Sequence, residues 1–123
     1  MSEARKLLIV DDSRVSRMLI KNLVSAMRPA WVCEEAASGE EALHKALAEV
    51  FDYATVDINM PGMDGLELTE QFRVECPQLR VCLVSANIQE DSRRRGELLK
   101  AGFVRKPITQ QSIIDVISYF EDA

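Results

Sequence analysis

Apolar residues gather in five short runs along the chain, separated by stretches long enough to hold a helix. The runs cover residues 7–10, 31–36, 53–57, 80–85 and 103–106. LLIV (7–10) and YATV (53–56) show no alternation of apolar and polar residues, which is typical of strands that are covered on both faces. The pattern therefore predicts five short strands that lie inside the fold.

The stretches between the runs carry apolar residues at helical spacing. Ser13 is placed to cap a first helix with one apolar side, made of Val15, Met18, Leu19, Leu23 and Ala26. Ser38 and Glu41 match a capping box for a second helix. We expect that helix to bury Leu43, Leu47 and Val50.

Three further helices complete the pattern. Leu68 and Phe72 predict a third helix that stops before Pro77, and a polar helix is expected over 89–100. Thr109 is placed to cap a last helix, which carries Ile113, Ile114, Ile117 and Phe120. Strand and helix thus alternate five times.

This alternation predicts an α/β fold. Short apolar strands joined by helices pair in parallel through right-handed crossovers, which gives an open sheet with helices on both faces. We expect five strands in the order 2-1-3-4-5, the flavodoxin-like doubly wound arrangement. With 123 residues, of which 47% are hydrophobic, the chain suits one domain over residues 1–123.

Charge and cysteine content narrow the functional classes. The net charge of −5 argues against binding nucleic acid through a basic face. No apolar run reaches membrane-spanning length and MSEARK is too polar for a signal peptide, so we expect a cytoplasmic protein. Three cysteines without a CxxC spacing are expected to be free thiols rather than a disulfide framework or zinc site.

Candidate chemistry stands at the carboxyl ends of the predicted strands, where ligands bind in sheets of this kind. The residues there are Asp11, Asp12, Asp57, Ser85 and Lys106. Crowded carboxylates repel each other unless a cation lies among them, and a set of oxygen ligands favours Mg²⁺. Taken alone, the two acids at 11 and 12 are better explained as helix-start acids, and it is their combination with Asp57, Ser85 and Lys106 that favours the metal site.

Asp57 is followed by NMPGMDG, a stiff loop bounded by glycine, so this strand ends on a carboxylate that can be reached from outside. A carboxylate can attack phosphorus and become an acyl phosphate, while a lysine and a hydroxyl hold the other phosphoryl oxygens. The arrangement therefore favours Asp57 as the acceptor of a phosphoryl group.

The segments VDD, VDINMPGMDG, VSA and KP, in this order and spacing, resemble the receiver domain of two-component response regulators. EEAASGEEAL (34–43) is similar to the second strand and helix of that family. The resemblance covers essentially the whole chain. It implies a CheY-like receiver in which Asp57 is the phosphoacceptor, Lys106 pairs with the phosphoryl group and Ser85 moves its hydroxyl toward it.

The same resemblance implies a metal site and a switch. Asp12, Asp57 and the backbone carbonyl of Asn59 would bind Mg²⁺ directly, and Asp11 would do so through water. Phe103 matches the aromatic switch position, and Pro107 would follow a cis peptide bond. The sequence also departs from the common pattern: Ser85 and Phe103 stand where Thr and Tyr are frequent, and Gly102 directly precedes the aromatic residue.

The function implied is phosphorylation by a histidine kinase or phosphotransfer protein. Phosphorylation would change the face formed by the fourth helix, fifth strand and fifth helix, which would bind a downstream protein or pass the phosphoryl group on. No output or DNA-binding region is expected within these residues, and the chain is expected to be a monomer or a phosphorylation-linked dimer. Two alternatives stay open: a metal-dependent phosphohydrolase and an unphosphorylated interaction module.

The hydrolase interpretation is weaker because such enzymes tend to carry a second acid two residues after the nucleophile, where this chain has Asn59.

Two predicted helices carry basic residues that allow further interpretations. Arg93, Arg94 and Arg95 form either a solvated face or a docking patch for an acidic partner. Arg14, Arg17 and Lys21 are candidates to flank the docking site of the phosphodonor protein.

Overall fold

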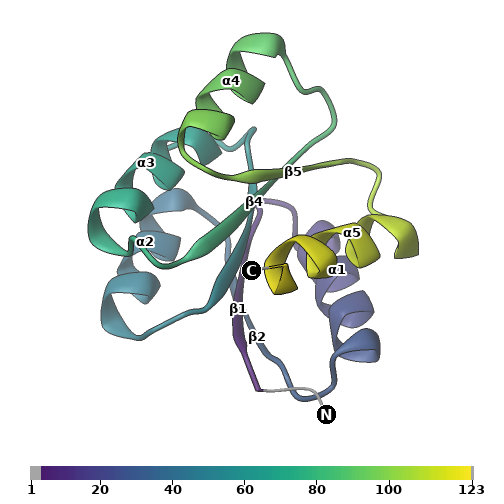
Figure 1. The fold of residues 1–123 in the computed structure, drawn as a ribbon. Coiled ribbons are helices and arrows are strands. Elements are labelled where there is room, and N and C mark those ends of the chain that lie inside the picture. The colour runs from purple at the N-terminus through teal and green to yellow at the C-terminus, as the bar shows by residue number, and fades with distance from the viewer. Residues whose placement is uncertain (1–3, 123) are drawn as a thin grey trace.

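The computed structural model describes residues 4–122 and forms a five-stranded parallel sheet with helices on both faces (Figure 1). The strands are β1 (Lys6–Val10), β2 (Val32–Ala36), β3 (Tyr53–Asp57), β4 (Arg80–Ser85) and β5 (Gly102–Arg105). The helices are α1 (Arg14–Met27), α2 (Gly39–Ala48), α3 (Gly65–Glu75), α4 (Glu90–Leu98) and α5 (Gln110–Glu121). The strand order is β2-β1-β3-β4-β5, so the predicted fold class and order are confirmed. The polar segment 1–6, used above to argue against a signal peptide, lies partly outside the described residues.

The register of the sheet brings the carboxyl ends of the strands to one edge. Val10 of β1 is paired with Val56 of β3, and Asp57 is paired with Val84 of β4. The residues that follow β1, β3 and β4 therefore emerge side by side. The β1–β3 pair lies at the centre of the sheet, where the strand order reverses.

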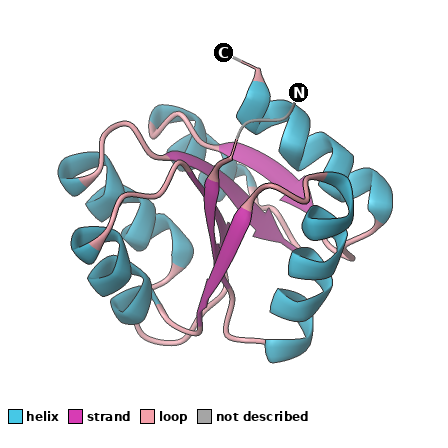
Figure 2. Ribbon diagram, turned by 90° about the horizontal axis from the view of Figure 1, so that it is seen from below, coloured by secondary structure: helices cyan, strands magenta, loops and turns pink. Residues whose placement is uncertain are grey.

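Helices lie on either side of the sheet (Figure 2), and an apolar cluster fills the space on each face. On one face, Leu8 and Val10 pack with Leu68 and Phe72 of α3. On the other, Leu7 and Ile9 pack with residues of α1 and α5. Each central strand thus buries side chains on both faces, which explains the unbroken apolar runs in the sequence.

Of the apolar side predicted for α1, only Leu23 packs against the core. Val15 is 75% exposed, and Met18, Leu19 and Ala26 are also exposed. The fully buried residues are Ile20 and Val24, with Leu23 packed partly against them. The helix has two apolar sides, and the side that contains Ile20 and Val24 packs on the sheet. The other side remains in solvent.

The prediction for α2 is wrong at two of its three positions. Leu47 and Val50 are exposed, and only Leu43 packs against the core, beside the fully buried Ala42. The helix ends at Ala48, so Val50 lies in the connection to β3. The expected capping box is half formed: Ser38 accepts from the Glu41 amide, but the Glu41 carboxylate accepts from the amide of Ala37 instead of that of Ser38.

The helix caps show which helices are well anchored. A full capping box of Asp64 and Glu67, missed in the sequence, opens α3. Another, made by Thr109 and Ser112, opens α5. By contrast, no side chain caps α4, and its only buried residue is Gly96. None of the helices within residues 4–122 is both long and apolar enough to cross a membrane.

Candidate functional site

Three carboxylates meet at the carboxyl edge of the sheet. Asp11 and Asp12 follow β1, Asp57 ends β3, and oxygen atoms of all three lie within 4.8 Å of one another. Asp11 and Asp57 are buried, whereas Asp12 is exposed. The structure therefore brings the predicted acids together at the carboxyl ends of the strands.

Lys106 supplies the positive charge of this cluster. Its Nζ atom lies 3.1 Å from Oδ2 of Asp11 and 3.6 Å from Oδ2 of Asp57. Burial lowers the pKa of Lys106, but the contacts with Asp11 and Asp57 outweigh it and raise the pKa above its ordinary value. The lysine is held at the edge by its own amide, which donates to the carbonyl of Ser85 at 2.9 Å. The bond between Lys106 and Pro107 is cis, as the resemblance implies.

Asp57 is hard to ionise in this setting. Burial and, next, the negative charge of Asp11 raise the pKa of Asp57 to about 6, against the opposing effects of the Asn59 amide and Lys106. The Asn59 amide donates to Oδ1 of Asp57 at 3.1 Å, which fixes that oxygen. The side chain is thus oriented by the protein while its negative charge is only partly compensated.

The donor set suits a hard divalent cation. Oδ1 of Asp11 accepts from the Ser13 amide at 2.8 Å, whereas the buried Oδ2 has no hydrogen-bond donor in good geometry among the described residues, only the nearby ammonium of Lys106. Carboxylate oxygens that carry unmet negative charge are the ligands that Mg²⁺ prefers. The carboxylates of Asp11, Asp12 and Asp57 therefore fit the predicted metal. The direct role predicted for the carbonyl of Asn59 and the water-mediated role predicted for Asp11 stay predictions.

Ser85 closes the other side of the site. Its side chain is buried, and its Oγ atom accepts from the side chain of Asn59 at 3.3 Å and donates to the carbonyl of Asn87 at 3.0 Å. The amide of Asn87 donates back to the same oxygen at 3.2 Å. Ser85 thereby links the loop after β3 to the loop after β4. A change of its hydrogen-bond partner would move both loops.

Gly65 explains why the loop after Asp57 ends on glycine. A β-carbon at this position would overlap the backbone carbonyl of Asp57 and lie 2.8 Å from the Cα atom of Ile58. The first residue of α3 thus packs directly on the end of β3, and its amide donates to the carbonyl of Ile58. This close approach holds β3 and the loop that follows it together.

Comparison with known proteins agrees with this geometry. The sequence family described as response regulator receiver domain matches residues 7–118. The chain is also 35% identical over 116 residues to chemotaxis protein CheY of Listeria monocytogenes, covering 91% of this chain and 94% of that protein. This chain belongs to the response regulator receiver domain family. Receiver domains of this family are signalling modules of two-component systems rather than turnover enzymes.

Other relatives carry the receiver as a part of a longer protein. The sensor protein EvgS of Escherichia coli is 35% identical over 94 residues, which are 76% of this chain and 8% of EvgS. A protein-glutamate methylesterase of Geobacter sulfurreducens is 34% identical over 116 residues, 90% of this chain and 32% of the enzyme. The receiver thus spans only a minor part of these first relatives, although it spans nearly all of CheY.

Solved structures support the same fold. Chemotaxis protein CheY4 of Vibrio cholerae is 26% identical, with a TM-score of 0.85 over 94% of this chain and 98% of that chain. The CheY of Borrelia burgdorferi, solved in a complex with CheX, BeF₃ and Mg²⁺, is 26% identical, with a TM-score of 0.85 over 93% of this chain and 87% of that chain.

Arg17 contributes to the receiver site in a way that the sequence did not reveal. Its Nη1 atom donates to the backbone carbonyl of Asp11 at 2.7 Å, and its Nε atom donates to Glu35 of β2 at 2.9 Å. The side chain is only 13% exposed, so it is an internal tie that holds the acidic turn to the edge strand. Nothing in the local sequence indicated this role, because the contact depends on how α1 crosses β2.

Phe103 lies beneath α4. Its half-buried ring packs against the core on the α3 side of the sheet. A β-carbon at Gly96 would overlap the tip of this ring, with the Cε2 atom only 2.7 Å away. The receiver therefore seats the predicted aromatic switch residue in a gap that the glycine of α4 leaves open.

The arginine run on α4 is paired within the domain. Arg93 lies 3.4 Å from Glu90 and 3.2 Å from Glu97, and Arg95 lies 3.4 Å from Glu70 of α3. These ion pairs are exposed, so each contributes little to stability. The geometry favours the solvated-face interpretation over a dedicated patch for an acidic partner.

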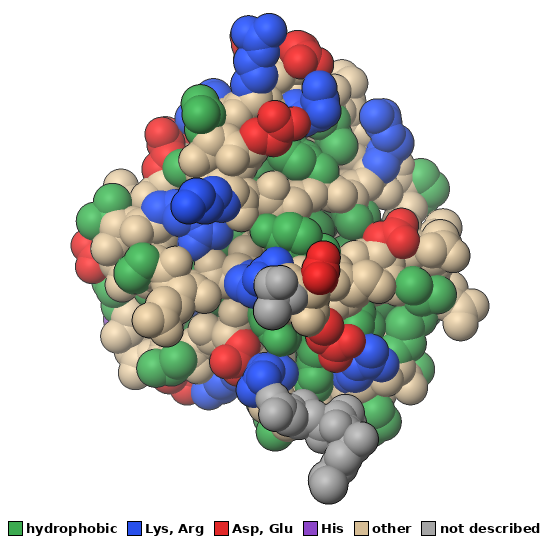
Figure 3. Space-filling view, in the orientation of Figure 1, with side chains coloured by type: hydrophobic (Ala, Val, Ile, Leu, Met, Phe, Trp, Pro, Cys, Tyr) green, Lys and Arg blue, Asp and Glu red, His purple; other side chains and the backbone are tan. Residues whose placement is uncertain are grey.

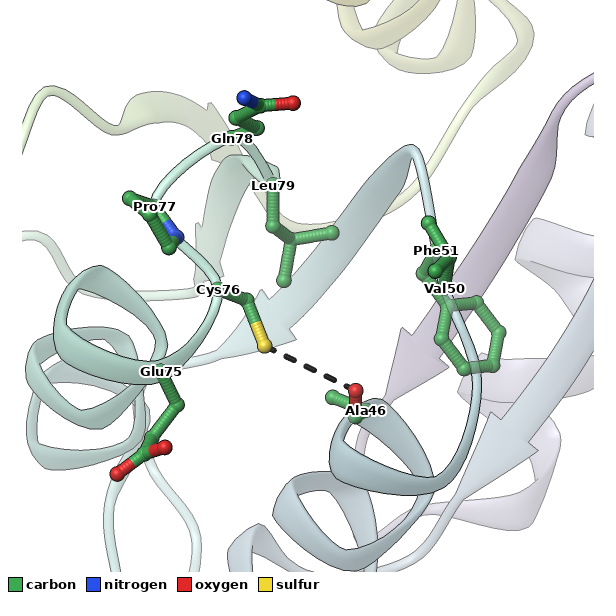
Figure 4. Close-up of a pocket in the computed structure, with 8 residues that line it drawn as sticks. All are labelled: Ala46, Val50, Phe51, Glu75, Cys76, Pro77, Gln78 and Leu79. Carbon is green, nitrogen blue, oxygen red and sulfur yellow. Dashed lines mark hydrogen bonds between the residues drawn. The ribbon is translucent and has the colours of Figure 1, made fainter.

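An apolar pocket lies at the opposite edge of the sheet (Figure 4). It has a volume of about 300 Å³ and is formed by the connections that precede β3 and β4. The thiol of Cys76 points across it toward the carbonyl of Ala46, at 3.8 Å. Burial raises the pKa of Cys76, which keeps the thiol protonated and unreactive at neutral pH. The pocket is therefore no part of the acidic site.

Proposed function

We propose that this receiver accepts a phosphoryl group on Asp57 from a histidine kinase or a histidine phosphotransfer protein. The observation that carries the proposal is the grouping of Asp11, Asp12 and Asp57 around one edge, with the ammonium of Lys106 between two of them. That arrangement supplies a nucleophile, negative charge for a cation and positive charge for a phosphoryl group. The reaction would depend on Mg²⁺.

The residues take distinct roles in this proposal. An oxygen of Asp57 forms a bond to phosphorus as the bond between phosphorus and the donor histidine nitrogen breaks, which gives an acyl phosphate. Lys106, already between the carboxylates, would pair with a phosphoryl oxygen. A bound Mg²⁺ would neutralise charge on the acids and the phosphoryl group. The Borrelia burgdorferi CheY complex with BeF₃ and Mg²⁺ supports this assignment by family likeness.

Signal output would follow from Ser85 and Phe103. In the structure, Ser85 Oγ bridges the side chain of Asn59 and the backbone of Asn87. A phosphoryl group on Asp57 would compete for that hydroxyl, draw the β4–α4 loop toward the site and alter the face made of α4, β5 and α5. That face would bind a downstream protein, or the phosphoryl group would pass to a further relay protein.

Three broader expectations belong to the same proposal. Residues 1–123 form one receiver domain, located in the cytoplasm, as the polar composition and lack of a long apolar run favour. The protein is a monomer or a dimer linked to phosphorylation. It dephosphorylates itself slowly and turns over no substrate, since Asn59 supplies an amide where phosphohydrolases tend to have an acid.

Intact-mass analysis tests the phosphorylation. The wild-type protein, incubated with acetyl phosphate and Mg²⁺, should gain the mass of one phosphoryl group, and chelation of Mg²⁺ should abolish the gain. Asp57→Asn is the negative control, and Asp115→Asn, an exposed acid on α5, is the matched positive control. If a purified phosphodonor protein and acetyl phosphate both leave the wild type unmodified, the interaction-module alternative is correct instead.

The phosphodonor is expected to dock on the exposed apolar side of α1. Val15, Met18 and Leu19 are exposed on the helix that begins just after Asp12. Arg14 is exposed beside them, whereas Arg17 is engaged with Asp11 and Glu35 and is unsuited to docking. Arg14→Glu should slow transfer from a phosphodonor protein but not from acetyl phosphate. Equal rates from the protein donor in Arg14→Glu and an Arg94→Glu control would disprove this docking site.

A further inference from the structure

Three basic residues line a hollow at the edge of the sheet opposite Asp57. Arg73 of α3, Arg80 of β4 and Lys100 surround a space of about 510 Å³, together with Tyr119. The other lining residues are Pro77, Gln78, Leu79, Leu98 and Leu99. None of the lining residues is acidic. Figure 3 shows Lys and Arg side chains gathered on this side of the molecule, below the end of α4.

The two arginines of the hollow differ from the other partly buried arginines. Arg17 pairs with Glu35 at 2.9 Å, and Arg28 pairs with a carboxylate of α5 at 2.8 Å. Within residues 4–122, neither Arg73 nor Arg80 has a carboxylate within ion-pair distance. This is unexpected in a chain that has 20 acidic and 15 basic residues. The charge of the hollow is therefore not met by side chains of the described domain.

Backbone carbonyls accept some of the hydrogen bonds that these two guanidinium groups can donate. Arg73 donates to the carbonyl of Leu99 at 2.7 Å and to that of Leu79 at 2.6 Å. Arg80 donates to the carbonyl of Tyr119 at 2.9 Å and stacks on the Tyr119 ring, 4.9 Å from its centre. Both guanidinium groups are thus fixed in place. A guanidinium has five N–H donors, so each keeps donors beyond these bonds.

The carboxyl ends of helices cannot neutralise the hollow completely. The ends of α3, α4 and α5 each contribute a partial charge of about −0.5, which sums to about −1.5 against three formal positive charges. An excess of about +1.5 remains. In addition, the Nε atom of Arg80 is buried without a hydrogen-bond acceptor among the described residues. A buried donor without an acceptor costs free energy.

We propose that this hollow binds a phosphorylated small molecule. Two positioned guanidinium groups and an ammonium suit an anion with two or more negative charges, and guanidinium groups bind phosphoryl oxygens in pairs. The apolar side chains of Leu98, Leu99 and Pro77 offer a surface for the organic part of such a ligand. The volume lies within the range of small-molecule sites.

A ligand bound in the hollow would affect α4, but its binding would not depend on phosphorylation of Asp57. Arg73 holds the carbonyl of Leu99, the residue that follows the last turn of α4, so a ligand on Arg73 contacts the anchor of that helix. Binding of the anion requires neither Mg²⁺ nor phosphorylation. The two proposals can therefore fail separately.

An amide-resolved NMR titration tests the site. Pyrophosphate and ADP are added separately to the ¹⁵N-labelled full chain, without divalent cations and at constant ionic strength. The proposal expects saturable shifts centred on Leu79, Leu99 and Lys100, with ADP binding at least as tightly as pyrophosphate. Shifts confined to the amides near Lys106 and Asp57 would place the anion in the acidic site and overturn the proposal, as would a response that does not saturate.

Matched variants decide whether the hollow is responsible. The double variant Arg80→Met/Lys100→Met should bind both probes about tenfold more weakly or worse, because each lost cation removes a charge-assisted hydrogen bond. The double variant Arg93→Met/Arg94→Met removes the same charge from the exposed face of α4 and should bind like the wild type. If Arg80→Met disturbs the fold, the exposed Lys100→Met alone is compared with Arg94→Met. Equal weakening in hollow and control variants would mean nonspecific attraction and refute the site.

Discussion

Asp57 combines two requirements that conflict. A nucleophile must be ionised to attack phosphorus, yet burial and the neighbouring Asp11 raise the pKa of Asp57 to about 6. The fixed amide of Asn59 and the ammonium of Lys106 compensate only part of this cost. Under the proposed function, the domain keeps a carboxylate that destabilises the fold because phosphoryl transfer to Asp57 requires it.

Asp57→Asn should therefore stabilise the domain at neutral pH without divalent cations. Because the folded state holds the proton of Asp57 more tightly than the unfolded state, wild-type stability falls as the pH rises from about 4 to about 6 and then levels off. The variant lacks this contribution. Its advantage in free energy of unfolding should be near zero at about pH 4 and reach about 1 to 3 kcal/mol at pH 7.

Urea denaturation of both proteins across this pH range measures the difference directly. Carboxylates remote from the site titrate in both proteins and cancel in the comparison, which isolates Asp57 together with its interaction with Asp11. A constant difference at every pH would show that the pKa of Asp57 is not raised in the folded state.

At the scale of elements, sequence pattern predicted the sheet well and the helices less well. The strands and their order follow from unbroken apolar runs and short connections, which admit few topologies. The buried side of α1 does not follow, because Val15–Leu19 and Ile20–Val24 both have helical spacing. Which side faces the sheet depends on how the turn after Asp11 sets the rotation of the helix.

The candidate site was predictable for a different reason. Asp11, Asp57, Ser85 and Lys106 all stand at strand ends, and the topology alone brings strand ends together. Contacts that depend on helix crossing were not predictable, such as that of Arg17 with the carbonyl of Asp11. The partner of Gly96 was equally hidden, since no pattern in the sequence relates a helix glycine to a ring on the neighbouring strand.

Gly96→Ala tests the contact between α4 and Phe103. In an unhindered helix this change would stabilise the protein by up to about 1 kcal/mol. Here the new β-carbon overlaps the Phe103 ring, so we expect destabilisation by about 1 to 3 kcal/mol. In a Phe103→Leu background the clash is relieved, and the same change should become neutral or stabilising. Urea denaturation of the four proteins forms the double-mutant cycle, and additive effects would show that the two residues do not interact.

The weak attachment of α4 leads to a separate expectation about motion. This helix has one buried residue and no side-chain cap, whereas α3 and α5 each have a capping box. Few buried contacts mean a low free energy of local opening. Hydrogen exchange should therefore be faster for the amides of α4 than for those of α1, α3 and α5. If the amides of α4 and α3 were equally protected from exchange, this expectation would be wrong.

At the scale of the whole molecule, the two edges of the sheet have opposite character. The carboxyl edge gathers negative charge around Asp57, and the other edge gathers unpaired positive charge around Arg73 and Arg80. Between them, α4 contacts both, through the loop that Ser85 holds at its start and through Arg73 at its end. The least anchored helix thus lies between two sites of opposite charge.

A cation bound at the acidic edge should stabilise the entire domain, because a ligand that binds only the folded state shifts the unfolding equilibrium. We expect millimolar Mg²⁺ to raise the melting temperature of the wild type by several degrees, since about 1 kcal/mol corresponds to about 4 to 8 °C in a small domain. Asp11→Asn and Asp57→Asn should each lose most of this shift, whereas the exposed Asp115→Asn should retain it. Calorimetric scans with Mg²⁺ and with chelator give the comparison. If Mg²⁺ raises the melting temperatures of all four proteins equally, the cation acts through the general negative charge of the domain and not through the acids at the strand ends.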